Sequence, residues 1–300
     1  PFTEAVVKGR SKKCPDCQTE LRFNLENLVD TQIERIFIED SKEAIDNSEV
    51  INAQKALSDK EVISLTGEYN YSFETNRRIL AFEGMKTSDL FTPRNYSVLC
   101  HIADVFNEID DVEIRKAALL LLTASVAQCS RLIPNRNDLS TGGPAWSVPG
   151  FWVPAEHLET NPIVHVRARY KKFVKALKEI NAGKYANNAS VDKKDAIVGM
   201  QEYRHNGKQA DLIFFDPPYG DSVPYLEFSA IWNSFLKDFP SADSDISVSD
   251  RKPKNESWED YNKKMKEVLG EISQTLSSNG KLLITFNNND IKAWEALLNG

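Results

Sequence analysis

The stretch that decides the fold is "DLIFFDPPYGDSVPYLEFSAIWNSFL", residues 211–236. Its first five residues, 211–215, predict a short buried strand, since Leu, Ile and Phe side chains pack well in sheets. Asp216, Pro217, Pro218 and Tyr219 follow at once. Because two prolines fix their own φ angles, the loop that they begin must be stiff. A strand that ends on a carboxylate and a rigid loop predicts a functional site.

The residues after this loop alternate between helix and strand patterns. Ser257 caps a predicted helix that ends near Asn279 and Gly280, "KLLITFNN" (281–288) predicts a second buried strand, and Asp290 caps a last helix. This order predicts parallel strands joined by right-handed crossovers. In such sheets ligands bind beyond the carboxyl ends of the strands, where Asp216 lies. Upstream, "ASVDKKDAIVGM" (189–200) is expected to be a strand leading to a loop.

The types of residue in the loop suit one kind of ligand. The Asp216 carboxylate is an acceptor, and the carbonyls of both prolines are expected to be free acceptors, since neither proline has an N–H. The Pro217 carbonyl is expected to act together with Asp216. Tyr219 adds a flat aromatic ring. Two acceptors and a stacking ring fit an exocyclic amine on a planar heterocycle, because each acceptor can take one amine hydrogen. Asp-Pro-Pro can also be a mere strand-terminating turn.

"DPPY" after an apolar strand resembles the catalytic motif of the S-adenosylmethionine-dependent methyltransferases that modify adenine N6 or, less often, cytosine N4. The longer string 211–236 is similar to adenine-specific DNA methylases that carry a zinc ribbon. "LFTPRNYSVLCHIADVF" and "NPIVHVRARYKKF" resemble the middle region of that family. The resemblance covers most of the chain and is most specific in 211–236, where the further matching positions are Asp221, Tyr225, Ser229 and Trp232.

The resemblance implies a function and roles for residues. It implies methyl transfer from S-adenosylmethionine to adenine N6 in DNA, with Asp216, Pro217, Pro218 and Tyr219 as the catalytic loop. Asp rather than Asn or Ser at the first position favours DNA adenine. Methylation of cytosine N4 or of RNA is one alternative, and a catalytically silent nucleic-acid-binding module is another. A base acted on in this way must leave the duplex.

One departure from the family concerns the cofactor. The Phe-x-Gly-x-Gly segment that clasps the methionine part of S-adenosylmethionine in that family is absent. In the family it precedes the ribbon, so we expect this sequence to be a fragment of a longer protein and to be inactive by itself. Asp195 resembles the acidic position near the cofactor's adenine, and Asp216 borders the same cofactor; the alternative for Asp195 is an ordinary surface carboxylate.

A Cys-x-x-Cys pair, Cys14 and Cys17, can hold one side of a tetrahedral zinc ion. No second close pair of Cys or His follows in the sequence, so the pair predicts half of a zinc ribbon. The alternative is two ordinary surface cysteines. The isolated Cys100 and Cys129 suit a reducing cytosol better than a disulfide framework.

Three helices are predicted between residues 92 and 183. The first begins at Thr92 and Pro93, with a buried face of Val98, Leu99, Ile102, Val105, Phe106 and Ile109. The second follows a cap at Asp110 or Asp111, and its apolar centre, 117–127, predicts deep burial. The third runs from Pro162 to Gly183. It carries the densest positive charge of the chain, so it is either a DNA-backbone contact or a solvated face: Arg167, Arg169, Lys171, Lys172, Lys175 and Lys178.

The composition bounds the class of protein. With 41% hydrophobic and 27% charged residues and a net charge of -7, the chain suits a globular protein that touches nucleic acid only through local basic patches. No apolar run is long enough for a membrane partner, and a cytoplasmic location is expected. We predict an α/β fold, a Rossmann-like methyltransferase core with a largely helical insert and a partial zinc ribbon. The segments are 1–25 (ribbon), 26–155 (insert and DNA recognition) and 156–300 (catalytic), with DNA and a restriction or defence-system protein as partners.

Overall fold

The computed structural model describes residues 67–76, 78–134, 150–154, 157–182, 189–239, 245–250 and 257–299, and four short strands before them. These strands form two antiparallel pairs: β1 (Ser11–Lys13) with β2 (Glu20–Arg22), and β3 (Ile36–Phe37) with β4 (Ala44–Ile45). Cys14 and Cys17 lie outside the described residues, so the half ribbon stays a prediction.

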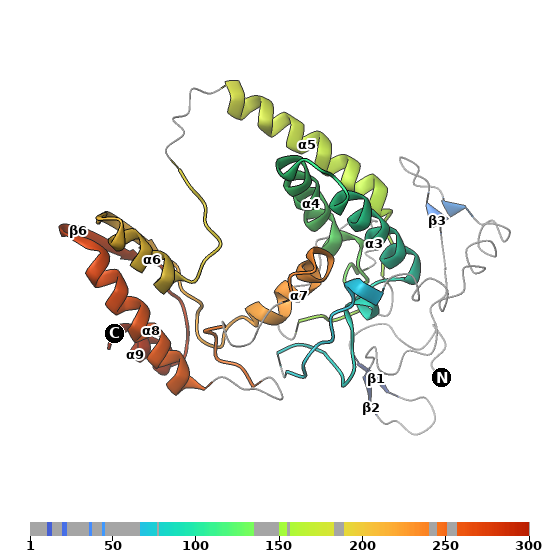
Figure 1. The fold of residues 1–300 in the computed structure, drawn as a ribbon. Coiled ribbons are helices and arrows are strands. Elements are labelled where there is room, and N and C mark those ends of the chain that lie inside the picture. Colours follow the sequence, from blue (N-terminus) through green and yellow to red (C-terminus); the bar gives the residue numbers. More distant parts are fainter. Residues whose placement is uncertain are drawn as a thin grey trace. The chain divides into compact units, whose positions relative to one another are not determined.

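The chain divides into two compact units, each made of segments that are far apart in the sequence (Figure 1). Unit 1 contains residues 1–73, 80–177 and 230–239, and unit 2 contains 74–79, 178–229 and 240–300. The division into the segments 1–25, 26–155 and 156–300 stays a prediction. Helix α7 (Tyr225–Leu236) begins in unit 2 and ends in unit 1.

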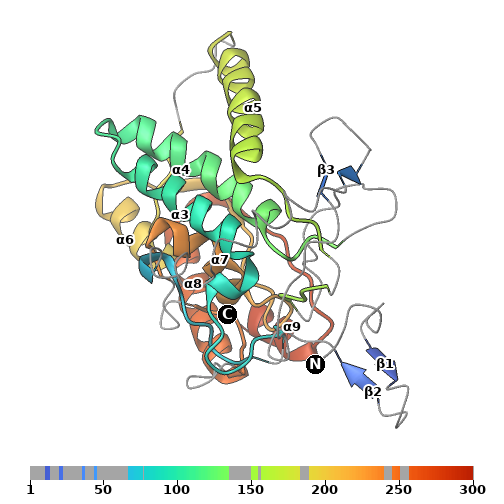
Figure 2. The same ribbon diagram turned by 90° about the vertical axis from the view of Figure 1, so that its right-hand side faces the viewer.

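After its four short strands, unit 1 is helical in its described part. It contains η3 (Gly67–Tyr69), η4 (Thr87–Leu90), α3 (Pro93–Asn107), α4 (Val112–Val126), η5 (Ala127–Cys129) and most of α5 (Pro162–Ala182). Thr92 caps α3 by accepting from the Asn95 N–H, and Asp111 caps α4. Both caps and the start of α5 at Pro162 confirm the predictions. Figure 2 shows α3 and α4 side by side.

An aromatic cluster forms the core of unit 1. The Phe235 ring packs at 5.7–6.1 Å from the rings of Tyr69, Phe91 and Tyr96. All four side chains are buried. The tail of α7 is therefore a core element of this unit, because it brings Phe235 into the cluster.

One expected face in unit 1 is confirmed in part and another is wrong. On α3 Leu99 is buried as predicted and Val105 is exposed, while the other predicted positions are half-buried; Tyr96, Cys100 and Ala103 complete the buried side. On α4 the predicted all-round burial fails. Ala118, Leu122 and Val126 face the core, while Leu120 is 56% exposed, since helices pack on only one side of it in the described residues.

Unit 2 is built on a parallel pair of strands. Strand β5 (Ala210–Phe215) pairs in parallel with β6 (Leu276–Ile284), and helices α6 (Ala196–His205), α8 (Trp258–Thr275) and α9 (Ile291–Leu298) pack beside them (Figure 1). Side chains alternate between the faces of a strand. Ile213, Phe215, Leu282 and Ile284 therefore pack against Val268, Leu269 and Ile272 of α8. On the other face Leu212, Phe214 and Leu283 are 64%, 61% and 53% exposed, so the prediction of two buried strands is wrong for that face. The mixed helix and strand content and the parallel pair agree with the α/β part of the predicted fold class.

Two predicted elements of unit 2 differ from those observed. Residues 196–205 form helix α6 rather than a strand, because Asp195 caps it and Ile197 and Met200, three residues apart, pack on α8. Helix α8 ends at Thr275 instead of near Asn279 and Gly280. Those two residues lie where the register between β5 and β6 shifts, so the expected turn is an irregularity inside the strand. The caps at Ser257 and Asp290 are confirmed.

Candidate functional site

Asp216 lies where β5 and β6 end together. The Thr285 N–H donates to the Phe215 carbonyl at 3.0 Å, which carries the strand ladder one residue past β6. The Thr285 hydroxyl then donates to Asp216 Oδ1 at 2.7 Å, and the Tyr219 hydroxyl donates to the same oxygen at 2.7 Å. Within the described residues no group donates to Asp216 Oδ2. Two hydroxyls therefore fix one carboxylate oxygen and leave the other open to a ligand.

These hydrogen bonds set the charge state of the pair. The hydrogen bond from Thr285, and then that from Tyr219, lower the pKa of Asp216 below its ordinary value. The same carboxylate raises the pKa of Tyr219, which stays a hydrogen-bond donor. Asp216 is therefore an anion at neutral pH and a weak base. Its chemistry is that of a hydrogen-bond acceptor.

The Tyr219 ring belongs to an aromatic row. It meets the Phe286 ring edge to face at 5.6 Å, and Phe286 meets the Trp294 ring of α9 at 5.1 Å. The Trp294 indole N–H also donates to the Asn288 carbonyl at 2.9 Å. The Tyr219 ring, which was expected to stack on a base, thus has a fixed position. Its hydroxyl is bound to Asp216 and its ring packs against Phe286.

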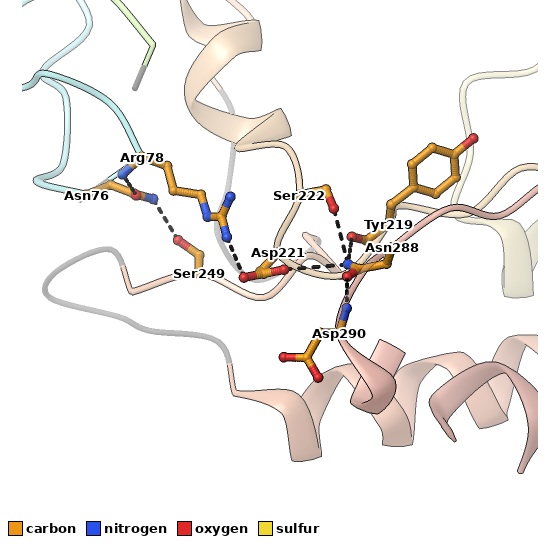
Figure 3. A network of polar contacts seen from close by, with 8 residues as sticks. All are labelled: Asn76, Arg78, Tyr219, Asp221, Ser222, Ser249, Asn288 and Asp290. Carbon is orange, nitrogen blue, oxygen red and sulfur yellow. Dashed lines mark hydrogen bonds and ion pairs between the residues drawn. The ribbon is translucent and has the colours of Figure 1, made fainter. Parts of the chain in front are cut away.

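Three consecutive carbonyls of the loop are already bound. The Tyr261 hydroxyl donates to the Pro218 carbonyl at 2.7 Å, and the Val248 N–H donates to the Gly220 carbonyl at 3.0 Å. Between them, Asn288 Nδ2 donates to the Tyr219 carbonyl at 2.7 Å (Figure 3). Burial raises the pKa of Tyr261 to about 12, so this donor keeps its proton.

Of the two prolines, only Pro217 keeps an unclaimed carbonyl. No described residue donates to its oxygen. The Pro218 carbonyl takes bonds from Tyr261 and from the Gly220 N–H, so the expectation that both prolyl carbonyls are free is wrong for Pro218. Pro217 and Asp216 therefore supply the two available acceptors, next to each other in the chain.

The remaining predicted residues lie elsewhere. Asp195 accepts from the Ile197 and Val198 N–H groups as the cap of α6, which is a structural use of the carboxylate. The basic residues belong to α5, where Arg167, Lys171, Lys172 and Lys175 are exposed and Arg169 is half-buried. The described residues contain no group of three or more His, Cys, Asp or Glu side chains that could hold a metal ion.

The sequence did not point to five residues that build the site. Thr285 and Asn288 could have been found, because they follow the second strand directly and the carboxyl ends of parallel strands meet at one edge. Tyr261 lies on α8 and is predictable only as a buried aromatic. Asn76 and Arg78 carry no local signal, since their partners are more than 140 residues away in the chain.

Comparison with known proteins adds nothing to this geometry: no protein-family model, curated protein or solved structure matches the chain. No helix in the described part of the chain is both long and apolar enough to cross a membrane. The function must therefore be argued from the site itself.

Replacing Thr285 with Val should raise the pKa of Asp216. The folded-state pKa is lowered by this hydroxyl first and by Tyr219 second, so T285V should produce a larger rise than Y219F. The stability that the lowered pKa contributes is present at neutral pH and is lost as the pH falls through that pKa. Titration of the Asp216 carboxyl carbon by NMR measures the rise, with T285S as the control that keeps the hydroxyl. An unchanged titration in T285V would contradict the assignment.

Proposed function

We propose that unit 2 holds the exocyclic amine of a nucleobase for methylation, and that the reaction is methylation of adenine N6 in DNA. The observation that carries the proposal is a pair of neighbouring acceptors to which no described residue donates, Oδ2 of the exposed Asp216 and the carbonyl of the buried Pro217, on a loop whose next three carbonyls are bound. The loop lies at the carboxyl ends of a parallel strand pair, where ligands of α/β folds bind. A Rossmann-like core is part of the same proposal.

The two acceptors act on the amine nitrogen. Each takes one of its two hydrogens, which draws the nitrogen lone pair out of conjugation with the ring and makes the nitrogen a better nucleophile. A preorganised acceptor is effective because it does not have to reorient during the reaction. Since the pKa of Asp216 is lowered, the carboxylate stays charged and accepts a hydrogen bond from the amine before transfer. The methylated nitrogen is cationic and loses one proton to solvent after transfer, at a loop where Asp216 is exposed.

Tyr219 completes the recognition of the base. Its hydroxyl is bound to Asp216 and its ring makes a T-shaped contact with Phe286, so the ring can be a fixed platform for a planar base. The amine of a paired adenine is engaged with its partner base, so the base must be extruded from the duplex or presented in a single strand.

The methyl donor that the resemblance implies is S-adenosylmethionine. The described residues do not fit this cofactor by themselves. They contain no glycine-rich loop of the kind expected to clasp it, and the Asp195 carboxylate serves as a helix cap. We therefore assign to this chain the amine-holding groups alone. A zinc ion at Cys14 and Cys17, a cytoplasmic location and a restriction or defence-system partner remain proposals of the same resemblance.

The proposal is tested by the product. The full-length protein is incubated with S-adenosylmethionine carrying a labelled methyl group and with single- and double-stranded DNA or RNA, and the nucleosides are separated by mass spectrometry. We expect N6-methyladenine in DNA. If the product is N4-methylcytosine or a labelled RNA nucleoside, the substrate is different but the reaction is still methylation of an amine. If the protein binds DNA tightly and labels no nucleoside, it is a catalytically silent binding module.

The basic face of α5 should hold the DNA backbone. Replacing Lys171, Lys172 and Lys175 with Gln should weaken binding to all DNA sequences alike, since phosphate contacts carry no sequence information. Each lost contact should reduce the slope of log affinity against log salt by about 0.9. The matched control replaces Lys263, Lys266 and Lys292 in α8 and α9, which changes the net charge equally. If the two triple variants lost DNA affinity and salt dependence to the same extent, the basic residues of α5 would be a solvated face and not a DNA contact.

A further inference from the structure

Residues 74–79 belong to unit 2, although the residues on both sides of them belong to unit 1. Two side chains of this short segment, Asn76 and Arg78, reach the catalytic loop and its supports (Figure 3). Arg78 and its partner Asp221 are 143 positions apart in the sequence. This short segment therefore contributes two polar side chains to unit 2, although the chain before and after it belongs to unit 1.

Arg78 holds the end of the catalytic loop. Its guanidinium forms an ion pair with Asp221 Oδ2, and both side chains are 24% exposed. Asp221 follows Gly220 directly and stands five residues after Asp216. The other oxygen of Asp221 faces Asn288 Nδ2 at 3.5 Å, and Asn288 donates to the Tyr219 carbonyl. The Arg78 guanidinium thus anchors the loop at Asp221, a few residues after the two proposed acceptors, Asp216 and Pro217.

Asn76 orients Arg78. Its Oδ1 accepts from the Arg78 N–H at 2.8 Å, and its carbonyl accepts from the Ile79 N–H at 3.2 Å, which closes a turn. Its amide donates to Glu227 Oε1 at 2.7 Å and to Ser249 Oγ at 2.9 Å. Asn76 is only 7% exposed, so these bonds are needed to bury it. The turn is therefore fixed to unit 2 at a point that aims Arg78 at Asp221.

We propose that Arg78 is a positioning residue for the amine site, and that it acts through Asp221 to keep the loop of residues 216–221 in its reactive geometry. This inference rests on the proposed function. Displacement of a reacting group by about 1 Å can cost about a hundredfold in rate, so a loop anchor affects turnover more than it affects substrate binding. Asn76 also helps to position the loop, but indirectly, because it holds the turn that carries Arg78.

The test compares R78Q with R94Q in the full-length protein. Arg94 pairs with Glu159 in unit 1 at nearly the same exposure, 24% and 26%, so R94Q removes a comparable ion pair from the unit that does not contain the loop. We expect R78Q to lower kcat at least about tenfold while KM for DNA changes less than about threefold. R94Q should leave kcat within about twofold of wild type. R78K, which keeps the charge, should recover part of the loss.

A second measurement does not depend on activity. The Gly220 N–H donates to the Pro218 carbonyl and the Ser222 N–H to the Tyr219 carbonyl. If Arg78 anchors the loop, hydrogen exchange at these two amides should be faster in R78Q and unchanged in R94Q. Because Arg78 acts through Asp221, the double variant R78Q/D221N should be no worse than R78Q, since residues in one network are not additive.

The possible outcomes separate the two proposals. Faster exchange together with a lower kcat supports positioning by Arg78. Unchanged exchange overturns it, whatever the activity, and so does a wild-type kcat in a variant whose exchange is faster. A wild-type protein that methylates no nucleobase refutes the proposed function, while the exchange measurement still decides whether Arg78 anchors the loop. If R78Q fails to fold, R78K and D221N are measured in the same way.

Discussion

Replacing Asp216 with Asn should abolish methyl transfer and leave the fold intact. The Asn oxygen can still accept from the Thr285 and Tyr219 hydroxyls, so the loop keeps its two local hydrogen bonds. The second position becomes an NH₂ group, which faces the substrate amine with a donor where an acceptor is needed. Loss of one preorganised group of this kind costs about 10²–10³ in kcat.

The control for this variant is D211N, on the same strand. Asp211 is exposed and accepts from Ser277 Oγ at 2.8 Å, so the change in charge is equal and the site is untouched. Single-turnover rates with DNA measure both variants. If D216N kept more than about a tenth of the wild-type rate, a barrier change below ~1.4 kcal/mol, the role of Asp216 as the essential acceptor would be refuted.

Replacing Gly220 with Ala should distort the catalytic loop. Gly220 has a φ of +59°, and a Cβ there would lie 2.8 Å and 2.9 Å from two ring carbons of Trp258. The left-handed backbone costs a non-glycine residue about 1–2 kcal/mol. Forcing a methyl group into a packed site costs about 1–3 kcal/mol more. The expected loss of about 2–5 kcal/mol in the free energy of unfolding is measured by urea denaturation.

Gly199 in α6 supplies the matched control for this variant. A Cβ at Gly199 meets no atom within 4 Å, so G199A should stabilise the helix by about 0.5–1 kcal/mol. We also expect G220A to reduce methylation, because Gly220 joins Tyr219 to Asp221. A G220A protein as stable as wild type would show that Trp258 can move away from the loop at little cost.

The sequence was sufficient for the parts of the site that are local. The β5 strand, Asp216 at its end, the caps at Ser257 and Asp290 and the parallel pairing with β6 all follow from short patterns, since propensity, capping and strand–helix alternation act over a few residues. The helix at residues 196–205 was missed because its short apolar run, interrupted by Gly199, satisfies a strand pattern as well.

The parts that were not predicted depend on packing between distant residues. The α4 sequence is apolar nearly all round, and only the tertiary structure decides that Leu122 faces the core and Leu120 faces outward. The occupation of the Pro218 carbonyl depends on Tyr261, 43 residues away. No local pattern encodes such a pairing, so the sequence could not distinguish the available carbonyl of Pro217 from the occupied one of Pro218.

The reach of residues 74–79 into unit 2 also determines when that unit can finish folding. Asn76 is synthesised 173 residues before its partner Ser249. At a ribosomal rate of about 5–20 residues per second, Asn76 waits roughly 9–35 s for that hydroxyl. During this time α3 and α4 can form from neighbouring residues, because helices need only local contacts. Unit 2 can close only after residues 257–299 are made, as a late step of high contact order. The proposed amine site is therefore complete only when β6, α8 and α9 have joined residues 74–79, which are made much earlier.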